Sequence, residues 1–117
     1  MSKPEFEFFP VTDVNWTPVP GKVSGLYERI LAHDATAGVA TRMLRFSPGT
    51  DTSASGTLTH DFWEEVYILE GSIYDIPLGK KFTAGMYACR PPGMKHGPWT
   101  SEEGCTTFEV RYFLRTA

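Results

Sequence analysis

The hydrophobic pattern of the chain consists of short apolar and aromatic runs separated by glycine, proline and small polar residues. Runs of strand length lie at 39–46, 64–70, 86–90 and 105–114. No stretch keeps the period of about 3.6 residues that marks an amphipathic helix. Because strands favour β-branched and aromatic residues and turns favour glycine and proline, the pattern predicts an all-β chain.

Shorter runs add to this all-β prediction. We expect further strands at 23–31, 57–60 and 72–76, and we expect Gly71 to end the strand that precedes the last of these. Polar or turn-forming segments should lie at 33–38, 51–56 and 100–104, which would leave His33 in solvent. Strands that recur between turns form few free edges when they close on themselves. The expected fold is therefore a single β-barrel or double-sheet jelly roll.

The first 25 residues differ in composition from the rest of the chain. They contain repeated prolines, which exclude a helix of any length. They also contain Phe6, Phe8 and Phe9, which are too apolar to be left together in water. We expect residues 1–25 to form an extended arm that packs on the barrel at 26–117, or on a partner subunit, as an edge strand does.

Length and charge exclude several classes of protein. A chain of 117 residues can bury one core but is too short for two domains. The net charge of −3 offers no basic face for nucleic acid. No apolar run approaches the roughly 20 residues of a membrane span, and the N-terminus lacks the features of a signal peptide. We expect a soluble cytoplasmic protein that binds neither nucleic acid nor membrane.

The candidate chemistry lies in two histidines and one acid. His60 and Glu64 are four residues apart across an expected bend, and His96 follows a separate strand and turn. Imidazole and carboxylate together suit zinc, iron, manganese, nickel or copper, so the ligand types alone do not choose the metal. An isolated histidine or acid in a globular protein is more often structural than functional.

The spacing of these residues resembles that of the cupins. The family's first motif is G-x5-H-x-H-x(3,4)-E-x6-G, and His60-x3-Glu64-x6-Gly71 is similar to its end. The second motif is G-x5-P-x-G-x2-H-x3-N, which Gly85-x5-Pro91-x-Gly93-x2-His96 resembles without a gap. Residues 64–71 and 90–96 look most like the ChrR-type branch of small single-domain cupins. The resemblance implies a cupin barrel with a metal held by His60, Glu64 and His96.

Three positions depart from the family pattern. Leucine occupies position 58, where the family has its first metal-binding histidine, and Thr52 and Thr100 replace the opening glycine and the final asparagine. One interpretation is that the metal is lost and the cavity remains as a binding pocket. The other is that two histidines and one carboxylate remain, as in non-haem Fe(II) oxygenases with open coordination positions.

Further residues are candidates for the walls and the proton chemistry of the site. We expect the pocket to be lined by Phe62, Trp63, Tyr87, Arg90, Met94 and Trp99. Glu65 and Tyr87 are candidates for moving protons, as general acids or bases do. Arg42, Arg45, Glu109 and Arg111 lie in strand-like runs, and the alternation does not say which face is the cavity; an outward direction is favoured slightly.

By resemblance, the first functional hypothesis is a metal-dependent enzyme that cleaves a carbon–carbon bond of a small ketone or diketone, as dioxygenases do. Its cofactor would be a divalent ion of iron, zinc, nickel or manganese. The alternatives are a non-catalytic ligand-binding or sensor cupin, and a metal-free isomerase that uses histidine as a base. We expect a small-molecule substrate or ligand and a homodimer, since small cupins commonly pair through their sheets.

Overall fold

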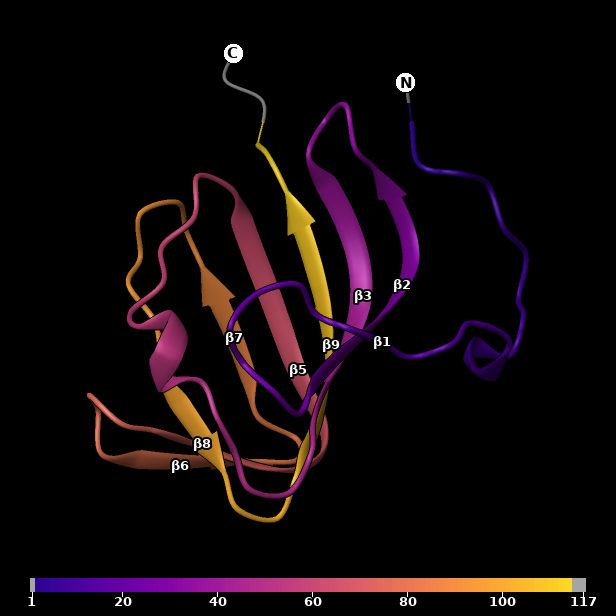
Figure 1. Ribbon diagram of the computed structural model, residues 1–117. Helices are drawn as coiled ribbons and strands as arrows, with labels where there is room; N and C mark the ends of the chain where they lie inside the picture. The colour runs from indigo at the N-terminus through magenta and orange to yellow at the C-terminus, as the bar shows by residue number, and fades with distance from the viewer. Residues whose placement is uncertain (1, 115–117) are drawn as a thin grey trace.

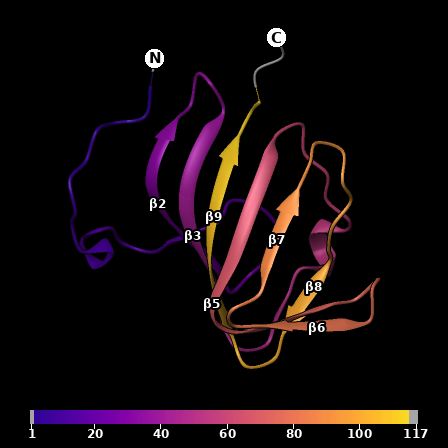
Figure 2. The same ribbon diagram turned by 180° about the vertical axis from the view of Figure 1, so that it is seen from behind.

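The computed structural model describes residues 2–114, and it is all-β apart from two short 3-10 turns. The larger of its two sheets contains β1 (Thr17–Pro18), β2 (Leu26–Asp34), β3 (Val39–Phe46), β9 (Cys105–Tyr112), β5 (Trp63–Asp75) and β7 (Tyr87–Arg90), side by side in that order. Figure 2 shows β2, β3, β9, β5 and β7 side by side in one curved surface. All of their pairings are antiparallel. The all-β expectation is confirmed.

The smaller sheet closes the lower end of the curved surface (Figure 1). It contains the last residues of β5 together with β6 (Lys80–Thr83), β8 (Trp99–Ser101) and β4 (Thr50–Asp51). Between the two sheets lies the apolar core, which consists of Leu44, Phe46, Ile68, Ile73, Trp99 and Cys105. The double-sheet arrangement expected from the sequence is therefore present.

Strand β5 belongs to both sheets because it bends at Gly71. Its first part pairs with β9 and β7, and Ser72 to Asp75 pair with β6. Gly71 has a φ of 79°, and a Cβ at this position would lie 2.0 Å from the carbonyl oxygen of Gly104. The expectation that Gly71 ends a strand is wrong, because here glycine allows one strand to turn from one sheet into the other.

Other differences from the sequence prediction concern short elements. The run expected at 57–60 is not a strand, and only Leu58 pairs there, with His96. β4 and β8 lie partly in segments expected to be loops. Strands of two and three residues are too short to show an alternating pattern. His33 lies in β2 rather than in a turn, and it is exposed as expected.

The N-terminal segment runs outside β2 (Figure 1). The Lys3 ammonium group donates a hydrogen bond to the Thr41 hydroxyl at 2.8 Å. Arg29 donates to the Val14 carbonyl at 2.7 Å, and its guanidinium lies 4.3 Å from the centre of the Trp16 ring. Strand β1 then pairs with β2 at the edge of the larger sheet. The division between arm and barrel at residue 25 stays a prediction.

Among the described residues, no helix is long and apolar enough to cross a membrane. The cytoplasmic location of the protein stays a prediction.

Candidate metal centre

Three hydrogen bonds between backbone groups join the two loops that carry the histidines. His60 lies on the segment before β5, and His96 lies on the segment between β7 and β8. Leu58 and His96 exchange both of their backbone hydrogen bonds, at 2.8 and 2.9 Å, and the Gly93 N–H donates to the His60 carbonyl at 2.8 Å. The loops are therefore held in register with one another, and β5 supplies Glu64 from the larger sheet.

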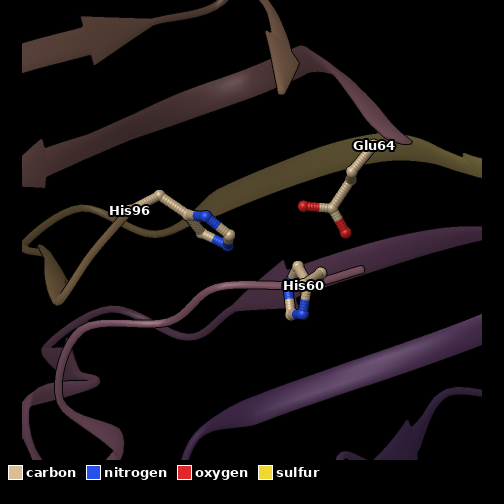
Figure 3. A group of neighbouring side chains, drawn as sticks. All are labelled: His60, Glu64 and His96. Atoms are coloured by element: carbon tan, nitrogen blue, oxygen red, sulfur yellow. The ribbon is translucent and has the colours of Figure 1, made fainter. Parts of the chain in front are cut away.

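The three candidate ligands are close enough to share one ion. One donor atom from each of His60, Glu64 and His96 lies within 4.8 Å of the other two. Figure 3 shows the side chains of His96 and Glu64 pointing toward one another, with His60 beside them. Metal–ligand distances of about 2.1 Å place neighbouring donors of a tetrahedral ion roughly 3.4 Å apart, so an inward shift of up to about 1 Å per ligand would complete the coordination.

Both imidazoles are held in a form that can bind a metal. Phe62 stacks on His60, with ring centres 4.5 Å apart and an interplanar angle of 11°. Nδ1 of His96 lies 3.2 Å from the Met94 carbonyl oxygen, so an Nδ1–H donates there and Nε2 keeps its lone pair. Burial is the main cause that lowers the pKa of both imidazoles, and nearby arginine charge lowers it further against the opposing effect of Glu64. The neutral imidazole, which is the metal-binding form, is favoured.

Glu64 is an ionised carboxylate between two arginines. Only 4% of the residue is exposed. Arg90 donates to one carboxylate oxygen at 3.1 Å, and the Nε–H of Arg111 donates to the other at 3.2 Å. Burial alone would raise the pKa of Glu64, but Arg90 and Arg111 outweigh it and lower the pKa. Each carboxylate oxygen has a second lone pair, so these hydrogen bonds orient Glu64 without blocking a metal.

A second ion-pair group lies beside Glu64 in the interior. Arg42 donates to Glu28 at 2.7 Å and to Glu109 at 3.1 Å, and the Thr107 hydroxyl donates to Glu109 at 2.9 Å. Together with Arg90, Arg111 and Glu64, this network contains three arginines and three glutamates. Its formal charges cancel, which satisfies the requirement that buried charges be paired.

The slight preference for outward-facing strand charges is wrong for three of the four residues concerned. Arg42, Glu109 and Arg111 line the interior cavity, whereas Arg45 is exposed. The inward residues are tolerated because each has an oppositely charged partner. Glu28, the partner of Arg42, was not recognised from the sequence, since only the pairing of β2 with β3 places it on the same face.

The interior cavity has a volume of about 360 Å³ and contains the candidate ligands. Of the expected pocket residues, Arg90 and Trp99 line this cavity. Met94 and Tyr87 border a neighbouring cavity, although the Tyr87 hydroxyl donates to Glu65 on the outer face of the sheet. Trp63 lies away from both cavities, where it stacks with Tyr112 at 6.4 Å between ring centres. The apolar wall nearest the ligands also includes Leu58, which sequence analysis treated only as a missing ligand.

Comparison with known protein families decides the identity of the fold. The ChrR cupin-like domain matches residues 6–113, which is nearly the whole chain. The chain belongs to this family. Comparison with curated protein sequences finds no match.

Solved structures agree with the assignment to the cupins. An RmlC-like cupin from Shewanella frigidimarina is 21% identical with a TM-score of 0.72, and the match covers 98% of this chain and 96% of that one. The polyketide cyclase RemF from Streptomyces resistomycificus is 22% identical with a TM-score of 0.74, over 97% and 83%. An acetylacetone dioxygenase from Acinetobacter johnsonii is 16% identical with a TM-score of 0.74, over 93% and 75%. At these identities the likeness shows the shared fold.

In this cupin the two candidate proton carriers are not brought to the candidate metal centre. Glu65 follows Glu64 on β5, and neighbouring residues of a strand point to opposite faces. The hydroxyls of Tyr87 and Tyr112 both donate to the Glu65 carboxylate, the latter at 2.6 Å. These hydrogen bonds lower the pKa of Glu65 and raise that of Tyr112 to about 12. Glu65 and Tyr87 thus form a polar cluster on the outer face of the sheet.

Proposed function

We propose that this cupin binds one divalent metal ion through His60, Glu64 and His96 and is an enzyme acting on a small oxygenated organic molecule. The supporting observation is that the three donor atoms lie within 4.8 Å of one another beside a cavity of about 360 Å³. By analogy with the acetylacetone dioxygenase of the same fold, the reaction to test first is oxidative cleavage of a ketone or diketone. Fold-level analogy alone does not fix a reaction, so the site has to be tested directly.

The residues of the chain have distinct roles in this proposal. A bound ion of iron, zinc, nickel or manganese would supply Lewis acidity, and iron would also supply reactivity toward O₂. Arg90 and Arg111 fix the two oxygens of Glu64. The Arg111 side chain is 26% exposed and lines the cavity, so its remaining N–H groups can donate to an oxygen of the substrate. Trp99 and Leu58 also line the cavity, and their apolar side chains would help to exclude water from it.

The first experiment is elemental analysis of the purified wild type beside His96→Ala. We expect close to one metal ion per chain in the wild type and a large loss in the variant. Aerobic iron-loaded protein should then consume O₂ with at least one member of a panel of diketones and hydroxyketones. A wild type that takes up no metal even after loading would contradict the proposal.

Leu58→His gives a matched gain-of-ligand control. Leu58 pairs directly with His96 in an antiparallel bridge. The side chains at these two positions therefore point to the same side, and their Cβ atoms are about 5 Å apart. An imidazole at position 58 should therefore reach the ion and raise its affinity by roughly tenfold or more. A loss of metal in this variant would mean that the ion does not lie between these residues.

A metal-free pocket is the second candidate, and two observations favour it. Leu58 removes one ligand of the family pattern, and Arg90 and Arg111 already balance the negative charge of Glu64, which weakens its attraction for a cation. In that case the barrel would be a binding or acid–base pocket, with histidine as the base. Absence of metal after loading, together with proton exchange on a bound ketone, would support this candidate.

We also propose a homodimer formed through the outer face of the larger sheet. Tyr67 pairs with Phe108 on β9 and with Tyr87 on β7, so the three aromatic side chains lie next to one another on this face. Tyr67 is 45% exposed and Tyr87 is 60% exposed. A contiguous exposed aromatic patch is typical of a protein interface.

A further inference from the structure

A second cavity adjoins the interior cavity at His96. Its volume is about 430 Å³. It is formed between the smaller sheet, β7 and the segments that flank β6 and β8, and its walls include Ile68, Leu78, Phe82, Met86, Ala88 and Met94. Pockets of this volume hold small organic ligands.

The two cavities share part of their walls. His96, Arg90, Val66 and Ile73 line both of them. His96 therefore has the candidate metal centre on one side and the second cavity next to it. The two cavities thus adjoin across these four side chains, and a molecule that meets His96 from the interior would reach the second cavity by passing between them.

The cavities differ sharply in chemistry. The interior one contains the network of arginines and glutamates around Glu64. The second is lined mainly by apolar side chains, and its acid Asp75 already accepts a hydrogen bond from the Leu78 N–H at 3.0 Å. Leu78 itself is 62% exposed at the rim. An open apolar cavity beside a polar centre favours a ligand that is polar at one end and apolar at the other.

We propose that the second cavity is the subsite for the apolar part of the substrate, whose oxygenated end meets His60, Glu64 and His96. The ligand class is a ketone or enolate with a chelating pair of oxygens and an alkyl chain or aromatic ring of several carbons. This inference rests on the proposed function, because it takes the metal centre as the place where the oxygenated end binds. It adds that the apolar part of the substrate lies in the second cavity beside His96.

The test compares equilibrium binding of diketones that share a head and differ in their apolar part. Calorimetry on the zinc-loaded protein with 2,4-pentanedione and 2,4-nonanedione measures the contribution of the added chain. Burial of each methylene strengthens binding on the order of two- to fourfold, so the longer ligand should bind at least about tenfold more tightly. Equal affinity for the two ligands would overturn the proposal.

Two variants of β7 test whether the tighter binding of the longer diketone comes from the second cavity. Ala88→Phe fills the second cavity, since Ala88 lines it opposite Val66. Cys89→Phe adds a ring to the next residue of the same strand, which points to the other face of the sheet. We expect Ala88→Phe to abolish the preference for the longer diketone without weakening 2,4-pentanedione, and Cys89→Phe to keep the preference. If Ala88→Phe kept the preference for the longer diketone, the alkyl chain of that ligand would lie outside the second cavity.

A ligand without the chelating pair separates this inference from the proposed function. In the protein as isolated, 2-nonanone should shift the methyl resonances of Met86 and Met94, which line the second cavity, and not that of Met43 on the outer side of β3. These shifts without any diketone binding would refute the metal-centred function and leave the apolar subsite standing. Diketone binding with no chain-length effect and no methionine shift would support the function and refute the subsite.

Discussion

Glu64 has a structural role in addition to any catalytic one, because this buried carboxylate is the shared anion of two half-buried arginines. Replacing it by glutamine leaves Arg90 and Arg111 without a negative partner in the interior. Removal of one partner from a buried ion pair costs about 3 kcal/mol of unfolding free energy. We therefore expect Glu64→Gln to lower stability by about that amount in urea denaturation of metal-free protein. Glu70→Gln, at an exposed position of the same strand, should have a small effect, and equal losses in the two variants would contradict this role.

The acid stability of the metal-free protein follows from the same residues. His60 and His96 have lowered pKa values in the folded protein, so below about pH 6.5 the unfolded chain binds more protons and stability falls. The pKa of Glu64 is also lowered, so its contribution is present above about pH 4.5 and is lost as the pH falls through the folded value. Both effects lower the unfolding free energy as the pH falls, and the loss from the histidines comes before the loss from Glu64.

Unfolding free energy measured in urea from about pH 8 to pH 4 checks this order. In His96→Asn the slope between about pH 7 and pH 5.5 should be shallower than in the wild type, while the later loss from Glu64 remains. A wild-type curve that rises as the pH falls through this window would contradict the assignment.

The candidate ligands could be predicted from the sequence, but the charged residues around them could not. The spacing of His60, Glu64 and His96 singled out these residues as a set, and the structure places their donor atoms together. The network of Arg42, Glu109 and Glu28 could not be found in the same way. Alternation divides a strand into two faces but does not say which face is buried, and only the strand register brings the three side chains together.

At the scale of elements, the bend at Gly71 is the point on which both sheets depend. Gly71→Ala combines a left-handed backbone with a Cβ placed 2.0 Å from the Gly104 carbonyl oxygen. Gly49 has a similar φ of 86°, but a Cβ added there would meet no atom within 4 Å, so Gly49→Ala tests the backbone strain alone. We expect a loss of about 1–2 kcal/mol for Gly49→Ala and about 4 kcal/mol or more for Gly71→Ala in urea denaturation. Equal losses would mean that β5 can straighten without cost.

The same bend shows which parts of the fold the sequence could predict. The run at 39–46 has the bounds of β3, because its apolar residues and the turn signals on both sides agree. Gly71 has the local signal of a strand end, and its role as a bend depends on Gly104, which is distant in the sequence. β4 and β8 were missed because their pairing depends on neighbours and not on a pattern of their own.

At the scale of the whole molecule, the outer aromatic patch determines the predicted assembly. Light scattering should give twice the mass of the chain. Tyr67→Lys places a charge at the centre of the patch and should yield a monomer with little change in folding, since like charges would meet across a two-fold interface. Ile76→Lys changes an exposed apolar residue that directly follows the part of β5 in the smaller sheet, and it should leave the dimer intact. A wild-type monomer would refute the proposal.

The double membership of β5 also has a consequence for motion. One strand pairs with β7 and β9 near Glu64 and with β6 and β8 near Asp75. Neither sheet can release β5 without disturbing the other, so the two sheets should open as one cooperative unit. The amide protons of β5 would then exchange with solvent water only in rare global openings, whereas those of β1 and β4 at the sheet edges would exchange much sooner. The geometry of the candidate metal centre is thus as persistent as the fold itself.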